Sequence, residues 1–351
     1  MNALPSPVQA PPSAPEILDR CRELVRPALT EAVGRLHPWV GEMAAYSFGW
    51  CEVGGAPAGA PGGKGVRQAL AVLGAEAAGA PGRAGVAGAV AVELVHAFSL
   101  LHDDIMDGDT TRRSRPTVWQ AYGTGPAVLA GDALFALAVE TLAAEPGGAG
   151  TLRLLSAALA DLVRGQADDL LFTDRPWTGP ERVSPAEYRT MAEHKTGALL
   201  GCAAALGATL GGAPGATVAA LDEAGRALGV AFQLVDDVLG IWGDPAVTGK
   251  PVHGDLRERK KTFPVLAALS CPGPAARRLA VLLGSGREPD AAAALIAELG
   301  GRAAALAEAR RYTATARAAL DGVPGATGAT WAAGAAAELR CLLDSLVRRD
   351  L

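Results

Sequence analysis

Apolar residues recur at intervals of three and four along most of the chain from Glu16 onward. In the first such segment, Ile17, Cys21, Leu24 and Val25 follow this spacing, which places them on one face of an α-helix. No run of residues shows sustained alternation of apolar and polar positions, the pattern of a half-buried strand. The chain is therefore predicted to be all-α, with essentially no sheet.

Glycine and proline mark the ends of the predicted helices. The uncharged stretch Gly197–Leu221 resembles a membrane span in hydropathy, but the sequence Gly-Gly-Ala-Pro-Gly interrupts it at 211–215. These turn-forming residues predict two buried helices that meet at a turn. We therefore expect no transmembrane segment.

The first 15 residues differ from the rest of the chain. They contain five prolines, no helical periodicity, and neither Lys nor Arg. This composition predicts a disordered Pro-rich tail at 1–15 and gives no sign of a secretory signal. The remaining residues, 16–351, are interpreted as one folded domain. With 50% hydrophobic residues, the chain is able to bury a large core.

Charge and cysteine content narrow the functional classes. The net charge of -5, without long basic blocks, argues against nucleic-acid binding. The five cysteines are scattered and form no Cys-x-x-Cys pair. This pattern favours reduced thiols over a disulfide framework or a zinc site, and it predicts a cytoplasmic location.

An acidic run follows the mostly apolar stretch Val86–Leu101. Asp103 and Asp107 share one helix face there, and Asp104 lies beside them. Like charges at this spacing repel, so a cation is expected to compensate them. Mg²⁺ is a natural candidate because it prefers oxygen ligands and is often bound by one or two carboxylates together with substrate phosphates. Taken alone, the run also fits a solvated acidic helix end.

A second acidic pair, Asp236 and Asp237, closes another long apolar helix. Each pair is followed by a loop rich in Arg or Lys. Packed side by side, such helices would leave an apolar cavity capped by carboxylates and cations. This arrangement suits a ligand with an apolar tail and a polyanionic head. The chain has no GxxxxGK[ST] sequence, which disfavours nucleoside triphosphates.

These motifs resemble those of the trans-isoprenyl diphosphate synthases, the polyprenyl synthetase family, from about residue 16 to the C-terminus. The sequence Asp-Asp-Ile-Met-Asp at 103–107 resembles the first aspartate-rich motif of the family, and Asp236-Asp237 opens the second. The resemblance implies a single large helical bundle of the isoprenoid synthase type around a central apolar cavity. It also implies a homodimer and a set of three Mg²⁺ ions.

The implied reaction joins isopentenyl diphosphate to an allylic diphosphate, head to tail. The allylic diphosphate ionises, the isopentenyl double bond attacks the cation, and a proton is then eliminated. Metal and cationic side chains would stabilise the leaving diphosphate, and the apolar cavity would exclude water. The product would be a short-chain all-trans polyprenyl diphosphate.

The resemblance assigns roles to particular residues, motif by motif. The implied metal ligands are Asp103, Asp104, Asp107, Asp236 and Asp237. The implied isopentenyl diphosphate site consists of Lys64, Arg67, His96 and Arg113. The implied contacts to the allylic diphosphate or its metals are Arg112, Lys195, Thr196, Gln233, Lys250 and Lys260. The residues expected to have the largest catalytic effect are Asp103, Asp107, Asp236, Lys195 and Arg112. Gly165-Gln166 with Asp169 resembles the helix motif that faces the developing cation.

One departure from the family pattern concerns Gly240, which stands where the second motif usually has its third Asp. The spacing of Asp236, Gly240 and Asp244 also resembles a metal motif of class I terpene cyclases. A cyclase would have no use for the basic isopentenyl site, so a synthase is favoured. A non-catalytic partner subunit is a further alternative, against which both Asp pairs and all the cations argue.

Product length is predicted from the residues that precede Asp103. Ser99 lies on the same helix face as Asp103 and is small, whereas Phe98 is bulky and would narrow a deeper level of the cavity. We hypothesise geranylgeranyl diphosphate (C20) as the product, with farnesyl diphosphate (C15) as the alternative. Some bacterial relatives are packaged in protein shells through extensions, so docking of the N-terminal tail to such a compartment is also considered. Arg115 and Lys261 are expected to be solvated.

Overall fold

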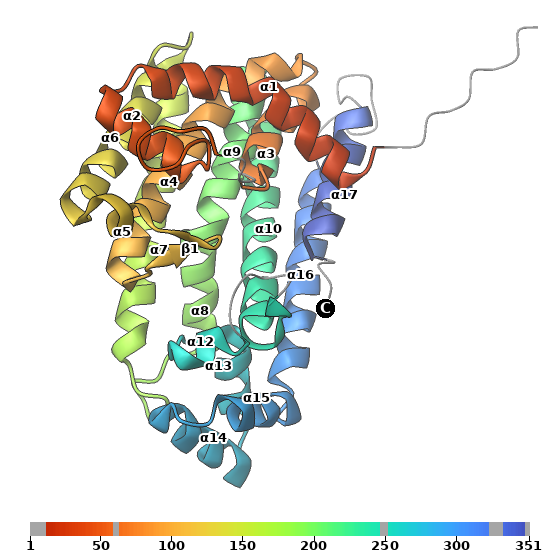
Figure 1. The fold of residues 1–351 in the computed structure, drawn as a ribbon. Coiled ribbons are helices and arrows are strands. Elements are labelled where there is room, and N and C mark those ends of the chain that lie inside the picture. The colour runs from red at the N-terminus through yellow and green to blue at the C-terminus, as the bar shows by residue number, and fades with distance from the viewer. Residues whose placement is uncertain (1–11, 59–62, 246–251, 323–332, 348–351) are drawn as a thin grey trace, which may run out of the picture.

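The computed structural model describes residues 12–58, 63–245, 252–322 and 333–347. Helices dominate these residues, as the sequence predicts (Figure 1). The described residues contain one small exception, the antiparallel pair of two-residue strands β1 (Thr111–Arg112) and β2 (Arg115–Pro116). This pair folds the basic loop after the first acidic run back on itself.

The helices of the first half of the chain are α1 (Ala14–Gly34), α2 (Pro38–Ser47), α3 (Val66–Ala77), the 3₁₀ turn η1 (Gly82–Gly85), α4 (Val86–Asp107), α5 (Val118–Tyr122), α6 (Thr124–Ala143) and α7 (Gly148–Asp174). Those of the second half are α8 (Pro185–Ala192), the π-turn η2 (Glu193–Gly197), α9 (Ala198–Leu210), α10 (Gly215–Trp242), α12 (Gly254–Arg257), α13 (Phe263–Leu269), α14 (Pro274–Ser285), α15 (Pro289–Glu298), α16 (Gly301–Asp321) and α17 (Ala333–Val347).

Helix α1 begins two residues before the predicted domain boundary. The carboxylate of Glu16 accepts hydrogen bonds from the backbone N–H and the hydroxyl of Ser13, at 2.8 and 2.7 Å. This contact satisfies a donor at the helix start, and Pro15 fits the first turn because its missing N–H is not needed there. The boundary at residue 16 is therefore wrong by two residues. The rest of the predicted tail, residues 1–11, lies outside the described residues.

Helix α4 ends directly after the acidic run, at Asp107. Gly108 caps it with φ of +71°, a left-handed conformation that costs glycine little. The helix is apolar because it is a core helix, packed between α3, α6 and α9. The turn after Gly108 leads directly into the basic hairpin, so the acidic helix end and the Arg residues stay close together.

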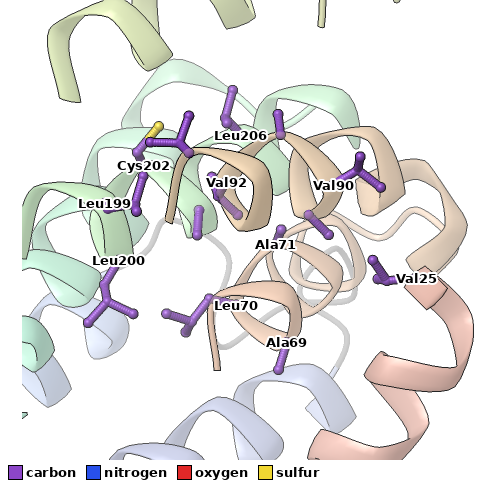
Figure 2. Packing of buried hydrophobic residues seen from close by; sticks show 14 of the residues in the cluster. Val25, Ala69, Leu70, Ala71, Val90, Val92, Leu199, Leu200, Cys202 and Leu206 are labelled. Atoms are coloured by element: carbon purple, nitrogen blue, oxygen red, sulfur yellow. The ribbon is translucent and has the colours of Figure 1, made fainter. Parts of the chain in front are cut away.

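The core is made of long helices that pack along one another. Helix α10 lies against α9 and α16, and α3 lies against α9 (Figure 1). Leu73, Leu94 and Leu206 are fully buried where α3, α4 and α9 meet. Figure 2 shows apolar side chains from these helices, including Ala71, filling the interface. Such close packing fixes the relative positions of the helices that carry the acidic motifs.

Two helices are long and apolar enough to cross a membrane by length and composition alone. They are Gly82–Asp107 and Thr124–Ala143, whose most apolar windows are 61% and 39% buried inside the fold. The stretch 197–221 instead forms α9 and the start of α10, which meet at a turn after Leu210. The prediction of two buried helices is therefore confirmed for that stretch.

Gly207 permits the closest approach between α3 and α9. A Cβ atom at this position would lie 1.9 Å from the carbonyl oxygen of Ala71. We expect Gly207→Ala to destabilise the protein by about 3 kcal/mol, since backbone cannot move aside as a flexible side chain can. Urea unfolding measures the effect. Gly34→Ala is the control, because nothing lies within 4 Å of that position; equal effects of the two changes would contradict the prediction.

Candidate active site

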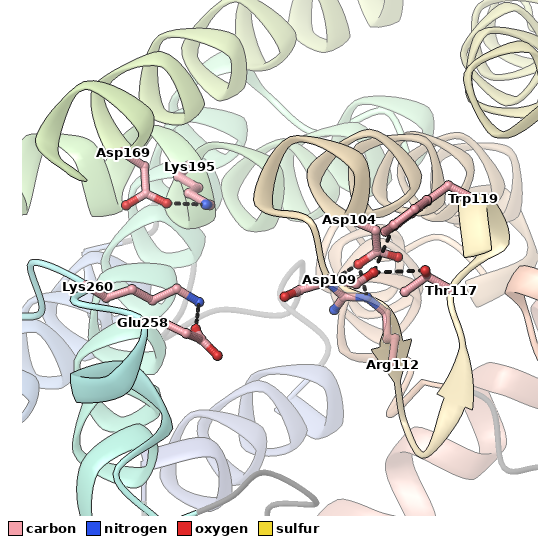
Figure 3. Close-up of polar contacts among 9 residues, drawn as sticks. All are labelled: Asp104, Asp109, Arg112, Thr117, Trp119, Asp169, Lys195, Glu258 and Lys260. Atoms are coloured by element: carbon pink, nitrogen blue, oxygen red, sulfur yellow. Dashed lines mark hydrogen bonds and ion pairs between the residues drawn. The ribbon is translucent and has the colours of Figure 1, made fainter. Parts of the chain in front are cut away.

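The two acidic motifs lie in the last turns of α4 and α10. The charges of Asp103 and Asp107 both interact with that of Lys195, and Asp107 also interacts with Lys260. Figure 3 shows these lysines on one side of the site, with Asp104 and Arg112 on the other. The fold thus brings the carboxylates of the first motif close to lysines that are far away in the sequence.

Asp103 is half-buried at this position. Burial raises the pKa of its carboxyl from 3.8 to about 6, and the neighbouring Asp107 adds to the shift while Lys195 opposes it. The ionised form is therefore disfavoured in the folded protein without a ligand. A bound cation would reverse this preference, so the carboxylate is prepared for metal rather than for solvent.

The raised pKa of Asp103 predicts a pH-dependent effect on stability. The folded protein binds a proton here more tightly than the unfolded chain, so this group costs stability as the pH rises from about 4 through 6. We expect Asp103→Asn, which removes the charge, to raise the Tm at pH 8 by a few degrees. Near pH 4 the Tm should hardly change. Thermal unfolding without metal tests this; a Tm at pH 8 no higher than that of the unchanged protein would contradict it.

The second Asp of each motif is bound to protein donors. The carboxylate of Asp104 accepts from Arg112 Nε at 2.8 Å and Nη2 at 2.6 Å. Asp237 is buried and accepts from the backbone N–H of Phe263 at 2.9 Å and from the hydroxyl of Tyr188. Burial, with the charge of Asp255 adding to it, raises the pKa of Asp237 to about 7. Asp104 thus holds the hairpin that follows the first motif, and Asp237 holds the start of α13, which follows the second.

The charges of Asp103 and Asp107 interact with that of Lys195 instead. No group of three or more His, Cys, Asp or Glu side chains within the described ranges is close enough to hold a metal by itself. The available donors are carboxylate oxygens, which suit Mg²⁺, and Mg²⁺ commonly completes its coordination with substrate phosphates and water. The residues present therefore fit a metal that binds together with a diphosphate.

A separate cationic cluster lies where α3, α4 and the hairpin meet. The Nε atom of Arg67 is buried without a hydrogen-bond partner in the described structure. Removal from water lowers the pKa of Arg67 to about 10, and Glu93 opposes this effect. His96 is kept neutral, because burial and the charges of Arg67 and Arg113 hold its pKa well below the usual value. The cluster thus keeps a positive charge and a donor available for an anion.

Glu93 is a member of this cluster that the sequence analysis does not identify. Its charge interacts with Arg67 and Arg113, while burial raises its pKa. It lies three residues before His96, and this i,i+3 spacing is the only sequence signal that points to it. The carboxylate partly balances the two arginines when no ligand is bound. Lys64 is exposed at the edge of this region.

The π-turn η2 places Lys195 and Thr196 in the site. Lys195 donates to Asp169 on α7 at 2.5 Å, and Thr196 donates to Gln233 on α10 at 2.9 Å. Gln233 in turn donates to Asp237 at 3.1 Å. Single π-turns within helices often mark functional sites. Thr196 and Gln233 are thus joined in one network with the second acidic motif, while Lys195 pairs with α7.

Gly165 and Gln166, which are adjacent on α7, also lie in this region. A Cβ atom at Gly165 would lie 2.3 Å from the backbone nitrogen of Lys195, so only glycine lets α7 approach η2 this closely. Both polar side-chain atoms of Gln166 are buried without a partner in the described structure. An unpartnered buried amide is costly unless a ligand engages it.

The segment after α12 contains two lysines with different surroundings. Lys260 pairs with Glu258 at 2.7 Å, and its charge interacts with that of Asp107 (Figure 3). The expectation that Lys261 is solvated is wrong. Its ammonium lies 3.4 Å from the centre of the Trp177 ring, and burial lowers its pKa to about 8. Lys250 lies outside the described residues.

Arg115 is also not solvated as expected. It donates to the carbonyl oxygens of Tyr46 at 3.3 Å and Cys51 at 2.7 Å. Its guanidinium stacks on the Tyr46 ring, 4.3 Å from the ring centre. These contacts hold the hairpin against α2, which in turn positions Arg112 and Arg113.

The two residues assigned to product length have distinct surroundings. The Phe98 ring packs against Phe135 of α6, with ring centres 5.6 Å apart, and against His102 at 4.8 Å. The Ser99 hydroxyl donates to the carbonyl of His96 at 2.9 Å, so it is satisfied within its own helix. Phe98 is therefore held by a second aromatic ring rather than free to swing.

This fold and site define a class: a helical protein with two helix-borne carboxylate sets and a separate cationic cluster. A model of the polyprenyl synthetase family matches residues 58–299. The chain belongs to this family of prenyltransferases, which confirms the resemblance seen in the sequence.

Named relatives agree with this assignment. A (2E,6E)-farnesyl diphosphate synthase of Mycobacterium bovis is 44% identical over 306 residues, which cover 84% of each chain. A geranylgeranyl diphosphate synthase of Mycobacterium tuberculosis is 45% identical over 269 residues, which cover 76% of this chain and 75% of that one. The crystal structure of a polyprenyl synthetase from Streptomyces coelicolor A3(2) matches with a TM-score of 0.87 and 47% identity, covering 94% and 98% of the two chains.

Proposed function

We propose that this protein condenses isopentenyl diphosphate with an allylic diphosphate to give a short-chain all-trans prenyl diphosphate. The observation that carries the proposal is the presence of two separate charged clusters of different chemistry, each suited to one diphosphate. One is formed by Asp103, Asp107 and Asp236 with nearby lysines, and the other by the cluster around Arg67 and His96. A condensation of two diphosphates needs both sites. The names of the relatives support this reaction.

Asp103, Asp107 and Asp236 would hold Mg²⁺, of which the family motif implies three ions. Bound there with the allylic diphosphate, the metal would stabilise the charge that develops on the leaving group. The proposed metal set is smaller than the five carboxylates of the sequence prediction. Asp104 and Asp237 already accept hydrogen bonds from Arg112 and Phe263, which supports a positioning role for them.

The protein side chains have separate tasks in this proposal. Lys195, Lys260 and Arg112 neutralise the allylic diphosphate, and Thr196 and Gln233 orient it. The neutral His96 donates one N–H to the isopentenyl diphosphate, while Lys64, Arg67 and Arg113 supply positive charge. Apolar residues of α4 and α7 exclude water, which would quench the allylic cation.

We propose geranylgeranyl diphosphate as the main product, with farnesyl diphosphate as the second candidate. Relatives named for each product are almost equally similar to this chain. The small Ser99 side chain would leave the cavity open just below the diphosphate, and the Phe98–Phe135 pair would close the cavity at a greater depth. Product analysis with isopentenyl diphosphate, Mg²⁺ and dimethylallyl, geranyl or farnesyl diphosphate tests this. Dominant chains of C30 or longer would refute it.

Phe98→Ala is expected to lengthen the product by at least one isoprene unit. The change removes the ring that packs on Phe135 and opens the space behind it. Chromatography of the dephosphorylated products measures chain length. Val281→Ala is the control, because Val281 is 71% exposed on α14, away from α4. An unchanged product distribution in Phe98→Ala would remove Phe98 from this role.

The same assay separates the alternative functions. A terpene cyclase would release diphosphate from an allylic substrate alone, whereas a synthase needs isopentenyl diphosphate to form product. A non-catalytic partner subunit would form no product with either. The cationic cluster around Arg67 favours the synthase, because a cyclase has no second diphosphate to bind.

We also propose a homodimer located in the cytoplasm. The exposed apolar side chains of Val128, Leu129 and Phe135 on α6 support association through that helix. Light scattering of the purified protein tests the oligomeric state. Docking of the N-terminal tail to a protein shell stays a prediction, because residues 1–11 lie outside the described residues. Deleting them while following co-purification would test it.

A further inference from the structure

Gly240 lies one helical turn beyond Asp236 on α10. Residues four apart share a helix face, so a side chain at 240 would stand beside that of Asp236. This is the place where the second motif of the family usually has its third carboxylate. Glycine supplies none, so α10 itself presents no carboxylate one turn beyond Asp236.

The space above Gly240 is already occupied. A Cβ atom at this position would lie 2.0 Å from Oδ2 and 2.4 Å from Cγ of Asp255. Asp255 is 7% exposed and belongs to α12, which packs against α10. No side chain fits at 240 while Asp255 keeps this position. The glycine and the aspartate are therefore a matched pair, one making room for the other.

The carboxylate of Asp255 also belongs to the electrostatics of the site. Its charge interacts with those of Asp237 and Lys260. The backbone N–H of Lys260 donates to the Asp255 carbonyl at 2.9 Å. The segment 255–260 thus carries both the carboxylate of Asp255, which lies over Gly240, and the ammonium of Lys260, whose charge interacts with that of Asp107.

We propose that Asp255 supplies, from α12, the third carboxylate that position 240 lacks. In this role it is a positioning residue that orients the ligands of the metal held at Asp236. The inference rests on the proposed metal site and adds the residue that takes the place of the third carboxylate of the second motif. It also explains why glycine is needed at 240, where any larger residue would displace Asp255.

An exchange of the two side chains tests the proposal. The variants are Asp255→Asn, Gly240→Asp, and the double change Gly240→Asp with Asp255→Gly, which moves the carboxylate from α12 to α10. The probe is Mg²⁺, titrated by calorimetry in the presence of a thiolodiphosphate analogue of the allylic substrate, whose carbon–sulfur bond does not ionise. Asp255→Asn is expected to raise the half-saturating Mg²⁺ concentration about tenfold or more, as loss of an outer carboxylate does at other metal sites.

The Gly240→Asp single variant should be impaired at least as strongly, since two carboxylates would compete for one space. The Mg²⁺ affinity of the double variant should return to within about threefold of the original value. Such a recovery would show that a carboxylate is needed at this place and that either helix can supply it. Unfolding temperatures are measured for each variant. A structural role alone would lower stability in Asp255→Asn while leaving the Mg²⁺ dependence unchanged, and that result would overturn the proposal.

Two controls complete the test. Gly254→Ala adds a methyl group on the same helix, where nothing lies within 4 Å, and should leave Mg²⁺ binding unchanged. Asp236→Asn should abolish Mg²⁺-dependent binding of the analogue. If Asp236→Asn binds normally, the metal site itself is refuted. If it fails while the double variant binds no better than Gly240→Asp, only the role of Asp255 is refuted.

Discussion

Asp103→Asn is expected to lower kcat by about 10³-fold or more, because it removes a charged group from the stabilisation of the departing diphosphate. Asn keeps the size of the side chain but binds Mg²⁺ far more weakly than a carboxylate does. The effect should appear in single-turnover reactions at saturating isopentenyl and allylic diphosphates. Added Mg²⁺ should restore little of the rate. Asp236→Asn is expected to have an effect of the same order.

Asp132→Asn is the matched control for this loss of activity. Asp132 lies on α6, and its side chain is 66% exposed, with a distant contact to His102 at 3.9 Å. We expect its kcat to stay within about twofold of the original, as for most exposed substitutions. The prediction fails if Asp103→Asn retains more than about a tenth of the original kcat. Asp103→Asn is also expected to have a higher Tm than the original protein at pH 8, so the loss of activity would not be caused by unfolding.

Arg67→Met is expected to raise the KM for isopentenyl diphosphate about 100-fold, with a much smaller change in the KM for the allylic substrate. The Nε atom of Arg67 has no protein partner in the described structure, so the full effect of losing this donor falls on the ligand. The change also removes the positive charge that most strongly opposes the raised pKa of Glu93, so a lower Tm is expected. Initial rates with one substrate varied at a time separate the two KM values.

Arg164→Met provides the comparison for Arg67→Met. Arg164 is 66% exposed on α7 and pairs with Asp161 at 3.0 Å. Its removal should leave both KM values unchanged, because an exposed ion pair contributes little. Equal increases in the two KM values for Arg67→Met would indicate a general disturbance of the site and would contradict a specific role in isopentenyl diphosphate binding.

Much of this structure follows from local sequence. Helix α4 follows from local sequence, because a mostly apolar stretch lies between Gly82 and Gly108, although the helix proper begins at Val86 after a 3₁₀ turn. The acidic motifs are found in the same way, since three like charges in five positions demand a partner. Several basic residues also lie where the family motifs imply, because those motifs fix the helix face and the loop on which each residue stands.

The remaining features depend on contacts between distant segments. Asp255 and Gly240 are 15 positions apart in the chain, and nothing in either local sequence shows that one fills the space of the other. Lys261 looks like any charged loop residue until Trp177, from before α8, is placed beneath it. Asp104 and Asp237 look like metal ligands by spacing, and only the fold shows that Arg112 and Phe263 donate to them. Tertiary packing, rather than residue type, decides each of these cases.

The π-turn at Glu193–Gly197 lies between α8 and α9, which otherwise form one continuous helix. Its extra residue changes the direction in which side chains of α9 point relative to those of α8. Before the turn, Tyr188 points to Asp237; after it, α9 packs on α3. Removing one residue here would restore an ordinary α-helix and rotate one half relative to the other by about 100°. Either Tyr188 would turn away from Asp237, or Gly207 would leave the contact with Ala71. The extra residue therefore lets the site and the core each keep their own helical register.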